Sequence, residues 1–345
     1  SVAVKSIIEQ LRAAGWMLVL GDGKGVDFNG FNAADPDNHY LPPPGTIAYG
    51  SGSGRRAMTY VGAIVIAYNM VLERLEFEGA ALDNREDPEA FPPLFILLDE
   101  IKALRDRWST ELAKEEFAAV EHMISEIAAT GRGSRIHMAI ISQDAYRGSI
   151  PKEWVGNVRM SLVVGRPTFN TIQNAFDDDR IKDKVKQVRE TMRPSDKGRC
   201  IVATDNDLTG HIDAVQYQNY FSYSPGSSWE RPNMPDGTAA EWSKFKTEVS
   251  DRVPRLYSRI WFKIDSKSEA QIAYEDETGE DLGFIDFDQF TVDEVKRMKR
   301  VNLDMRNPDG KIVPNPEYAK YDPNSPLYVC RPPAHATRRY INPVL

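Results

Sequence analysis

The stretch Pro93-Leu-Phe-Ile-Leu-Leu-Asp99-Glu100 places five apolar residues directly before two adjacent acids. A run this short and this apolar predicts a strand that is buried on both faces of a parallel sheet. A second apolar run, 137–141, follows some forty positions later and ends in Ser142-Gln143. Open α/β folds bind their ligands at the carboxyl edge of such strands. We therefore expect the two acids and Gln143 to lie at a ligand-binding edge.

Asp99 and Glu100 have two interpretations that this stretch alone leaves open. In nucleoside-triphosphate hydrolases such a pair divides the chemistry, because the Asp holds Mg²⁺, usually through water, and the Glu orients or deprotonates the attacking water. The other interpretation is a core strand followed by an acidic helix start, since Asp caps helices and Glu favours the first turn. Other motifs have to decide between them.

Composition limits the class of protein. A chain of 345 residues can bury a sizeable core in one or two domains. A net charge of -8 argues against a broadly basic nucleic-acid binder but does not exclude a local basic channel. Cys200 and Cys330 lack CxxC spacing, which disfavours a disulfide framework or a zinc site and favours a reducing compartment. The most apolar helical stretch, 61–72, is too short to cross a bilayer, and there is no signal-peptide pattern. We expect a cytoplasmic location.

Helical and strand patterns alternate over the first two thirds of the chain. The predicted helices are 2–14, 55–77 and 114–130, and the predicted strands are 16–20, 94–98, 137–141, 160–164 and 199–203. Residues 26–54, rich in Gly, Pro, Asn and Asp, read as an irregular excursion. This alternation predicts an α/β fold with a mainly parallel sheet and helices on both faces. Prolines then become frequent, so we predict a core domain over 1–225 and an irregular C-terminal appendage over 226–345.

Three segments, in this order, resemble the FtsK/SpoIIIE-type DNA-pumping ATPases of the wider FtsK/HerA group. They are Trp16-Met-Leu-Val-Leu-Gly-Asp-Gly-Lys24, the Asp99-Glu100 strand, and Gly131-Arg-Gly-Ser-Arg-Ile-His-Met-Ala-Ile-Ile-Ser-Gln143. The resemblance covers roughly residues 1–205 and implies a RecA-like P-loop NTPase core. The sequence departs from the family at Ser134-Arg135, where small residues are usual, at Ser142 in place of Thr, and at Asp144 in place of Arg.

The resemblance implies ATP and Mg²⁺ as cofactors and a role for each site residue. Asp99 becomes the metal ligand, Glu100 the catalytic carboxylate, and Gln143 the sensor that contacts the γ-phosphate and the attacking water. Arg132 becomes an arginine finger that reaches a neighbouring subunit's nucleotide, with Arg135 and Arg166 as competitors. The ordinary alternatives are a turn-capping amide for Gln143 and a cation favoured by a helix C-terminus for Arg132.

The first residues resemble the helix that follows the Gly-Lys of a phosphate-binding loop, with Ser1 as the loop's nucleotide- and Mg²⁺-binding hydroxyl. The sequence contains no Gly-x-x-x-x-Gly-Lys, and the glycine cluster 50–56 lacks the Lys and reads as a flexible turn. We therefore expect the sequence to be truncated at its Walker A motif, with any membrane anchor in the missing N-terminal part. Such a chain should bind ATP poorly by itself.

The resemblance also implies a ring, expected to be a hexamer, around double-stranded DNA. Loop residues that could face the DNA are Arg55, Arg56, Arg147 and Lys152, although solvation is the default for each. Two other functions stay open: a type VII secretion-like ATPase of the same group that moves proteins, and a non-catalytic remnant or adaptor. The secretion alternative fits the acidic balance and the absence of a basic DNA-reading domain. The stretch 275–290, which has seven acids and no Lys or Arg, is expected to be a solvated face and a poor contact for a phosphate backbone.

Smaller features have both a functional and an ordinary interpretation. Asp22 and Lys24 follow another predicted strand at the same edge, where they could steady the site or a subunit contact, or form an ordinary turn ion pair. His137, at the start of a buried strand, is expected to be a core histidine.

Overall fold

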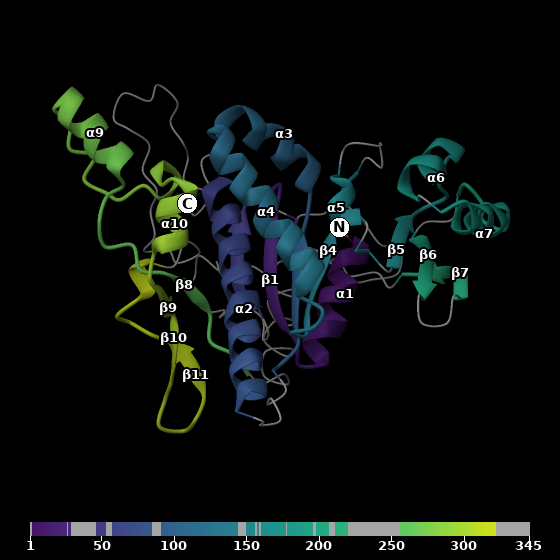
Figure 1. The fold of residues 1–345 in the computed structure, drawn as a ribbon, viewed down its shortest axis with the longest axis horizontal. Coiled ribbons are helices and arrows are strands. Elements are labelled where there is room, and N and C mark those ends of the chain that lie inside the picture. The colour runs from purple at the N-terminus through teal and green to yellow at the C-terminus, as the bar shows by residue number, and fades with distance from the viewer. Residues whose placement is uncertain are drawn as a thin grey trace, which may run out of the picture.

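A four-stranded parallel sheet forms the centre of the protein (Figure 1). The computed structural model describes residues 2–25, 27–28, 46–52, 57–84, 91–143, 150–155, 157–158, 160–176, 178–195, 198–206, 211–219 and 256–321. The central sheet has the order β2-β1-β3-β4, and each neighbouring pair is parallel. Its strands are β1 (Met17–Asp22), β2 (Thr46–Ser51), β3 (Leu94–Leu98) and β4 (Ile136–Ile140).

Helices cover both faces of this sheet, which confirms the predicted α/β architecture. Helix α1 (Val2–Ala13) packs Val4 and Ile8 against Leu18 and Leu20 of β1. On the other face, α2 (Ala57–Asp83) and α4 (Lys114–Thr130) pack against the residues of β1 that alternate with these two. Because successive strand side chains point to opposite faces, an unbroken apolar strand needs helices on both sides.

Strand β2 corrects the prediction of an irregular segment over 26–54. All its residues are buried, and it pairs with β1. Its sequence, Thr-Ile-Ala-Tyr-Gly-Ser, has few strongly apolar residues and follows a Pro- and Gly-rich stretch, so composition concealed it. Gly50 serves the packing: a Cβ there would lie 2.1 Å from the Thr59 carbonyl oxygen, so only glycine lets α2 approach this closely.

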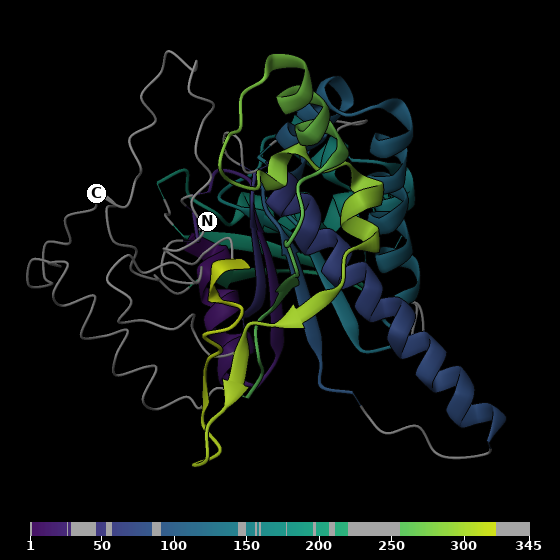
Figure 2. The same cartoon turned by 90° about the vertical axis from the view of Figure 1, so that its left-hand side faces the viewer.

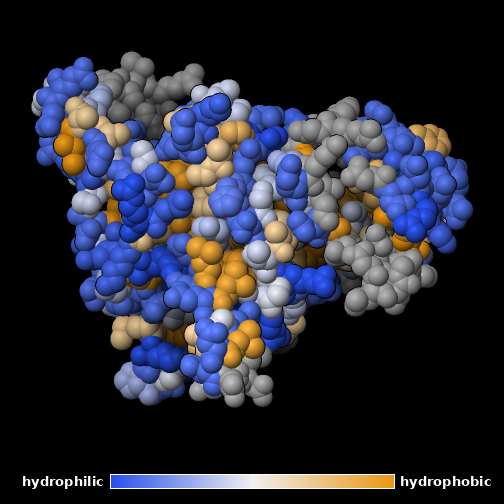
Figure 3. Space-filling model, in the orientation of Figure 1, coloured by the Kyte–Doolittle hydropathy of each residue, from blue (hydrophilic) through white to orange (hydrophobic). Residues whose placement is uncertain are grey.

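Helix α2 extends further than the predicted 55–77 and projects beyond the body of the molecule (Figure 2). Its last turns carry Glu, Leu and Ala, which favour helix without needing burial. Figure 3 shows a mostly hydrophilic face with apolar side chains gathered where α2 runs. The large exposed apolar residues of α2 are Leu72, Leu75, Phe77 and Leu82. Helix α3 (Ile101–Glu111), which directly follows β3, was not among the predicted helices.

The predicted strands at 160–164 and 199–203 do not extend the parallel sheet. They form β5 (Met160–Val164) and β6 (Arg199–Asn206), which join β7 (His211–Gln218) in a separate antiparallel sheet. Helices α6 (Phe169–Ala175) and α7 (Asp179–Glu190) cover one face and share a small core with it. The ends of β5 are exposed, whereas a strand of a doubly covered sheet is buried on both faces.

The described C-terminal segment, 256–321, packs onto the α2 side of the central core. Trp261, Phe262 and Phe287 belong to the same apolar cluster as α2 and α4. Buried Asp304 pairs with Arg259 at 2.8 Å and fixes the start of this segment. Its elements are β8 (Ile260–Phe262), α9 (Glu269–Thr278), η2 (Phe287–Gln289), α10 (Val292–Arg297), β9 (Arg300–Asn302), β10 (Asp304–Arg306), β11 (Ile312–Pro314) and η3 (Ala319–Tyr321).

The domain boundary predicted near residue 225 lies outside the described residues.

One short helix, α5 (Lys152–Val155), anchors buried Trp154, whose indole N–H donates to Ser125 Oγ at 2.8 Å. Among the described residues, no helix combines the length and the apolar character needed to span a membrane.

Candidate functional site

The carboxyl ends of β1, β3 and β4 bring several polar side chains to one edge of the sheet. Strand β1 ends at Asp22, β3 leads into Asp99 and Glu100, and β4 leads toward Gln143. Helix α1 runs into β1 through a short turn, so its N-terminal end returns to this same edge. Lys5 in α1 agrees with this: burial lowers its pKa, and the charges of Asp27 and Asp22 act in the opposite direction. The edge therefore combines acids with a helix N-terminus.

Glu100 is held between a cation and an amide. Lys24 Nζ lies 2.8 Å from Glu100 Oε1, and Gln143 Nε2 donates to the same oxygen. The hydrogen bond to Glu100 and the negative charge of Glu100 raise the pKa of Lys24. Glu100 has φ 54° and ψ 32°, the left-handed region, which is uncommon for a residue with a side chain and costs on the order of 1 kcal/mol. The structure thus brings together Glu100 and Gln143, as the sequence predicted, and adds Lys24 as a direct contact.

Gly23 allows this arrangement. A Cβ at this position would lie 2.5 Å from Glu100 Cβ and 2.7 Å from the Asp99 carbonyl oxygen. Both distances are shorter than a van der Waals contact, so the turn after β1 can lie against the end of β3 only when this residue is glycine.

Asp99 is buried with an unsatisfied oxygen. The residue is 3% exposed, and among the described residues its Oδ2 atom has no hydrogen-bond partner. Its backbone carbonyl oxygen accepts a hydrogen bond from the Tyr60 hydroxyl at 3.1 Å, which fixes the end of β3. Burial raises the pKa of Asp99 to about 7, and the nearby charge of Asp27 adds to this rise. An ionised, buried carboxylate with an unsatisfied oxygen lowers the stability of the fold unless a cation binds to it.

Asp22 and Asp27 lie beside Asp99. Asp22 is fully buried; its Oδ1 accepts from the Gly25 N–H at 2.8 Å, and its Oδ2 accepts from the Phe28 N–H at 2.9 Å and the Tyr49 hydroxyl at 3.2 Å. Despite these bonds, burial raises the pKa of Asp22.

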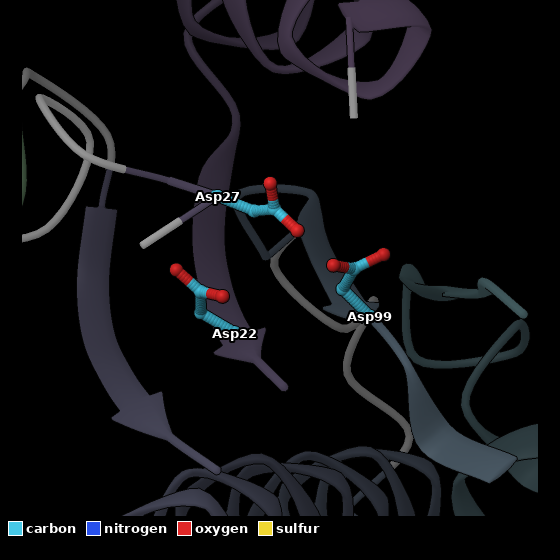
Figure 4. A group of neighbouring side chains, drawn as sticks. All are labelled: Asp22, Asp27 and Asp99. Atoms are coloured by element: carbon cyan, nitrogen blue, oxygen red, sulfur yellow. The ribbon is translucent and has the colours of Figure 1, made fainter. Parts of the chain in front are cut away.

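One oxygen from each of these three aspartates lies within 4.8 Å of the other two, and Figure 4 shows the Asp27 and Asp99 carboxylates facing each other with Asp22 beside them. Sequence reasoning missed Asp27, which fell in the segment read as irregular. The available signal was two aspartates five positions apart across a glycine-rich turn.

This donor set fits Mg²⁺. Carboxylate oxygens are the hard ligands that Mg²⁺ prefers, and the unsatisfied Asp99 oxygen is free to accept one coordinate bond or a metal-bound water. Asp99 can therefore serve as a metal ligand, and this assignment stays a prediction. Ser1, the other predicted metal ligand, lies outside the described residues.

The predicted arginines lie elsewhere. Arg132 is exposed in the turn between α4 and β4, at the amino end of β4, and Arg135 in the same turn donates to the Phe91 carbonyl oxygen at 2.8 Å. Strand β4, five residues or about 16 Å long, separates this turn from the Glu100 edge. Arg166 lies beside the small sheet, 3.6 Å from Glu190. Since an arginine finger acts on a neighbouring subunit, its assignment to Arg132 stays a prediction.

The remaining sequence candidates are of three kinds. His137 on β4 is half-buried against Trp16, with ring centroids 5.3 Å apart, and burial lowers its pKa, as expected for a core histidine. Lys152 begins α5, but its side chain is not among those described. The other candidate DNA contacts lie outside the described residues: Arg55, Arg56 and Arg147.

Two solved structures are among those similar to this chain. A scan of protein-family models and a search of curated proteins found no match. The pCW3 conjugation coupling protein TcpA, solved as a monomer with ATPγS, is 17% identical with a TM-score of 0.45, over 63% of this chain and 56% of that one. EssC (ATPases 2 and 3) from Geobacillus thermodenitrificans is 15% identical with a TM-score of 0.41, over 73% of this chain and 41% of that one.

This chain thus matches about half the length of each of these two proteins. The function has to be argued from the residues of the site.

Proposed function

We propose that this chain is the core of an FtsK/SpoIIIE-type motor that hydrolyses ATP with Mg²⁺. The observation that supports this most is the Glu100 carboxylate, fixed by Lys24 and Gln143 beside buried Asp99 at the carboxyl edge of a parallel sheet. An ordinary helix start requires neither a buried acid with an unsatisfied oxygen, as at Asp99, nor a Glu with left-handed backbone angles, as at Glu100. Backbone strain of this kind is more typical of a functional site than of a structural turn.

Each residue has a part in the proposed reaction. The N-terminal end of α1 offers backbone N–H groups and a positive dipole to the phosphates. Asp99 would hold Mg²⁺, which when bound neutralises charge that develops on the phosphates. Glu100 orients the attacking water and accepts its proton, while the Lys24 ammonium keeps the carboxylate in position. Gln143 contacts Glu100 directly and is therefore placed to respond when the γ-phosphate leaves.

We further propose double-stranded DNA as the moved substrate and a ring, most simply a hexamer, as the working assembly. Support for these two points comes from the motif resemblance, above all Gly131-Arg132 through Gln143. The net charge of -8 and the acidic stretch 275–290 favour the second candidate, a secretion-type ATPase that moves protein. The two candidates share one active site and differ in what stimulates it.

The test uses protein expressed from the complete reading frame. ATP hydrolysis is measured alone, with linear double-stranded DNA, and with DNA at rising salt. The DNA motor predicts strong stimulation that falls steeply with salt, because phosphate contacts release counterions. Hydrolysis that DNA leaves unchanged would reject the DNA motor and favour the secretion-type ATPase, and no hydrolysis with or without DNA would also reject the DNA motor.

A further inference from the structure

The three aspartates around the end of β1 have a property that nucleotide chemistry does not explain. An active site that receives ATP must tolerate several negative phosphate charges, yet Asp22 and Asp27 add two more carboxylates beside Asp99. We propose that Asp22, Asp27 and Asp99 form a binding site for one hard divalent cation that is occupied without nucleotide. The site shares Asp99 with the proposed ATPase, but binding of the ion requires neither ATP nor hydrolysis.

The geometry of the three oxygens suits a single ion. The three carboxylate oxygens, one from each aspartate, all lie within 4.8 Å of one another. Two ligands on opposite sides of one ion are about 4.2 Å apart for Mg²⁺ and about 4.8 Å apart for Ca²⁺, since metal–oxygen distances are about 2.1 and 2.4 Å. One ion can therefore contact all three carboxylates with little movement of the backbone.

The carboxylates retain the lone pairs that such an ion needs. Ionised Asp offers about four acceptor sites, and three of those on Asp22 are used by Gly25, Phe28 and Tyr49. The Oδ2 atom of Asp99 is buried and, within the described part of the chain, has no partner. This second observation separates the cluster from an ordinary acidic patch, because a buried acceptor without a donor or a cation is costly.

The hydrogen bonds of Asp22 also build the site. By binding the N–H groups of Gly25 and Phe28, Asp22 turns the chain back so that Asp27 returns toward the ends of β1 and β3. Asp27 keeps 23% of its side chain exposed and lies 3.7 Å from Lys24 Nζ. An ion can enter from solvent past Asp27 and reach Asp99, which is buried.

The local charge supports an ion of charge two. Among the described residues, four carboxylates meet here, from Asp22, Asp27, Asp99 and Glu100. Two ammonium groups offset them: Lys24, paired with Glu100, and Lys5, which interacts with Asp22 and Asp27. When all are ionised, the four negative and two positive charges leave an excess of two negative charges, which a divalent cation neutralises. With oxygen ligands alone, the expected class is Mg²⁺, Mn²⁺ or Ca²⁺.

The test is a nucleotide-free titration of the EDTA-treated 345-residue chain with MnCl₂, with free Mn²⁺ followed by electron paramagnetic resonance. The expected result is one saturable Mn²⁺ per chain that Mg²⁺ displaces. Asp27→Asn should weaken binding at least tenfold. Asp106→Asn is the matched control, because its carboxylate is 62% exposed on α3 and pairs with Lys102; it should leave binding unchanged.

Melting temperature gives a second readout that stays informative if a variant folds less well. At an Mn²⁺ concentration near the wild-type Kd, the ion should raise the melting temperature of the wild-type and Asp106→Asn proteins clearly more than that of Asp27→Asn. Absence of saturable Mn²⁺ binding, or binding that Asp27→Asn leaves intact, would overturn the proposal. If Mn²⁺ bound only together with ATPγS, the nucleotide-free site would be rejected while the proposed ATPase stood. If Mn²⁺ bound without nucleotide but the complete protein hydrolysed no ATP, the cation site would stand and the proposed ATPase would be rejected.

Discussion

Replacing Asp99 with Asn should stabilise the metal-free protein at alkaline pH. Burial raises the pKa of Asp99 from 3.8 to about 7, so the folded chain keeps a proton that the unfolded chain releases at lower pH. The contribution of Asp99 to stability is therefore most favourable below about pH 4 and declines as the pH rises toward 7. A rise of roughly three pKa units, at about 1.36 kcal/mol per unit, gives a cost of about 4 kcal/mol for the ionised group above pH 7.

Asn cannot ionise, so Asp99→Asn escapes this cost. In EDTA at pH 8, urea unfolding should show the variant more stable than wild type by about 2–4 kcal/mol, and this difference should shrink toward zero near pH 4.5. Adding Mn²⁺ at pH 8 should narrow the difference, since the ion stabilises only the protein that keeps the carboxylate. Asp106→Asn, on the surface of α3, controls for the general effect of removing an acid.

If Asp99→Asn were no more stable than wild type at pH 8 in EDTA, the ionised carboxylate would not be the cost that its burial implies. A stability difference that is constant between pH 4.5 and pH 8 would also contradict this prediction, because the effect would then come from packing and not from titration.

Three further substitutions test other parts of the structure. Lys24→Met removes the cation 2.8 Å from Glu100 and should lower ATP hydrolysis by the complete protein at least tenfold with little change in ATPγS affinity; equal hydrolysis would mean that the ion pair is only structural. Gly23→Ala places a Cβ 2.5 Å from Glu100 Cβ, so it should cost about 1–3 kcal/mol in urea unfolding and lower hydrolysis, and wild-type values for both would contradict the close approach. Asp304→Asn removes the buried negative charge that pairs with the Arg259 guanidinium and should cost about 3–5 kcal/mol; a loss under 1 kcal/mol would show that this pair does not hold the C-terminal segment.

The sequence predicted the parts of the fold that local pattern determines. Strands β3 and β4 were recognisable because each is a short apolar run, and parallel strands place their carboxyl ends at one edge. The contact between Glu100 and Gln143, which are 43 residues apart, follows from that rule and from the register of β3 on β4.

Other parts depend on contacts that local pattern does not carry. Strand β2 is buried because α2 packs over Gly50, and the composition of β2 does not predict that burial. Asp27 reaches the site because Asp22 binds the N–H groups of the turn between them. The separate antiparallel sheet and the packing of Trp261 on α2 depend on contacts between segments that are far apart in the sequence, and local pattern does not predict such contacts.

If Glu100 activates the water that attacks ATP, as proposed, its replacement by Gln should stop hydrolysis without loss of nucleotide binding. Wild-type and Glu100→Gln proteins from the complete reading frame are compared for single-turnover ATP hydrolysis and for ATPγS affinity in Mg²⁺. Hydrolysis should fall at least a hundredfold while affinity changes less than about threefold, since the amide keeps the shape of the side chain but cannot accept the proton. Hydrolysis at the wild-type rate in Glu100→Gln would show that Glu100 is not the group that activates the water.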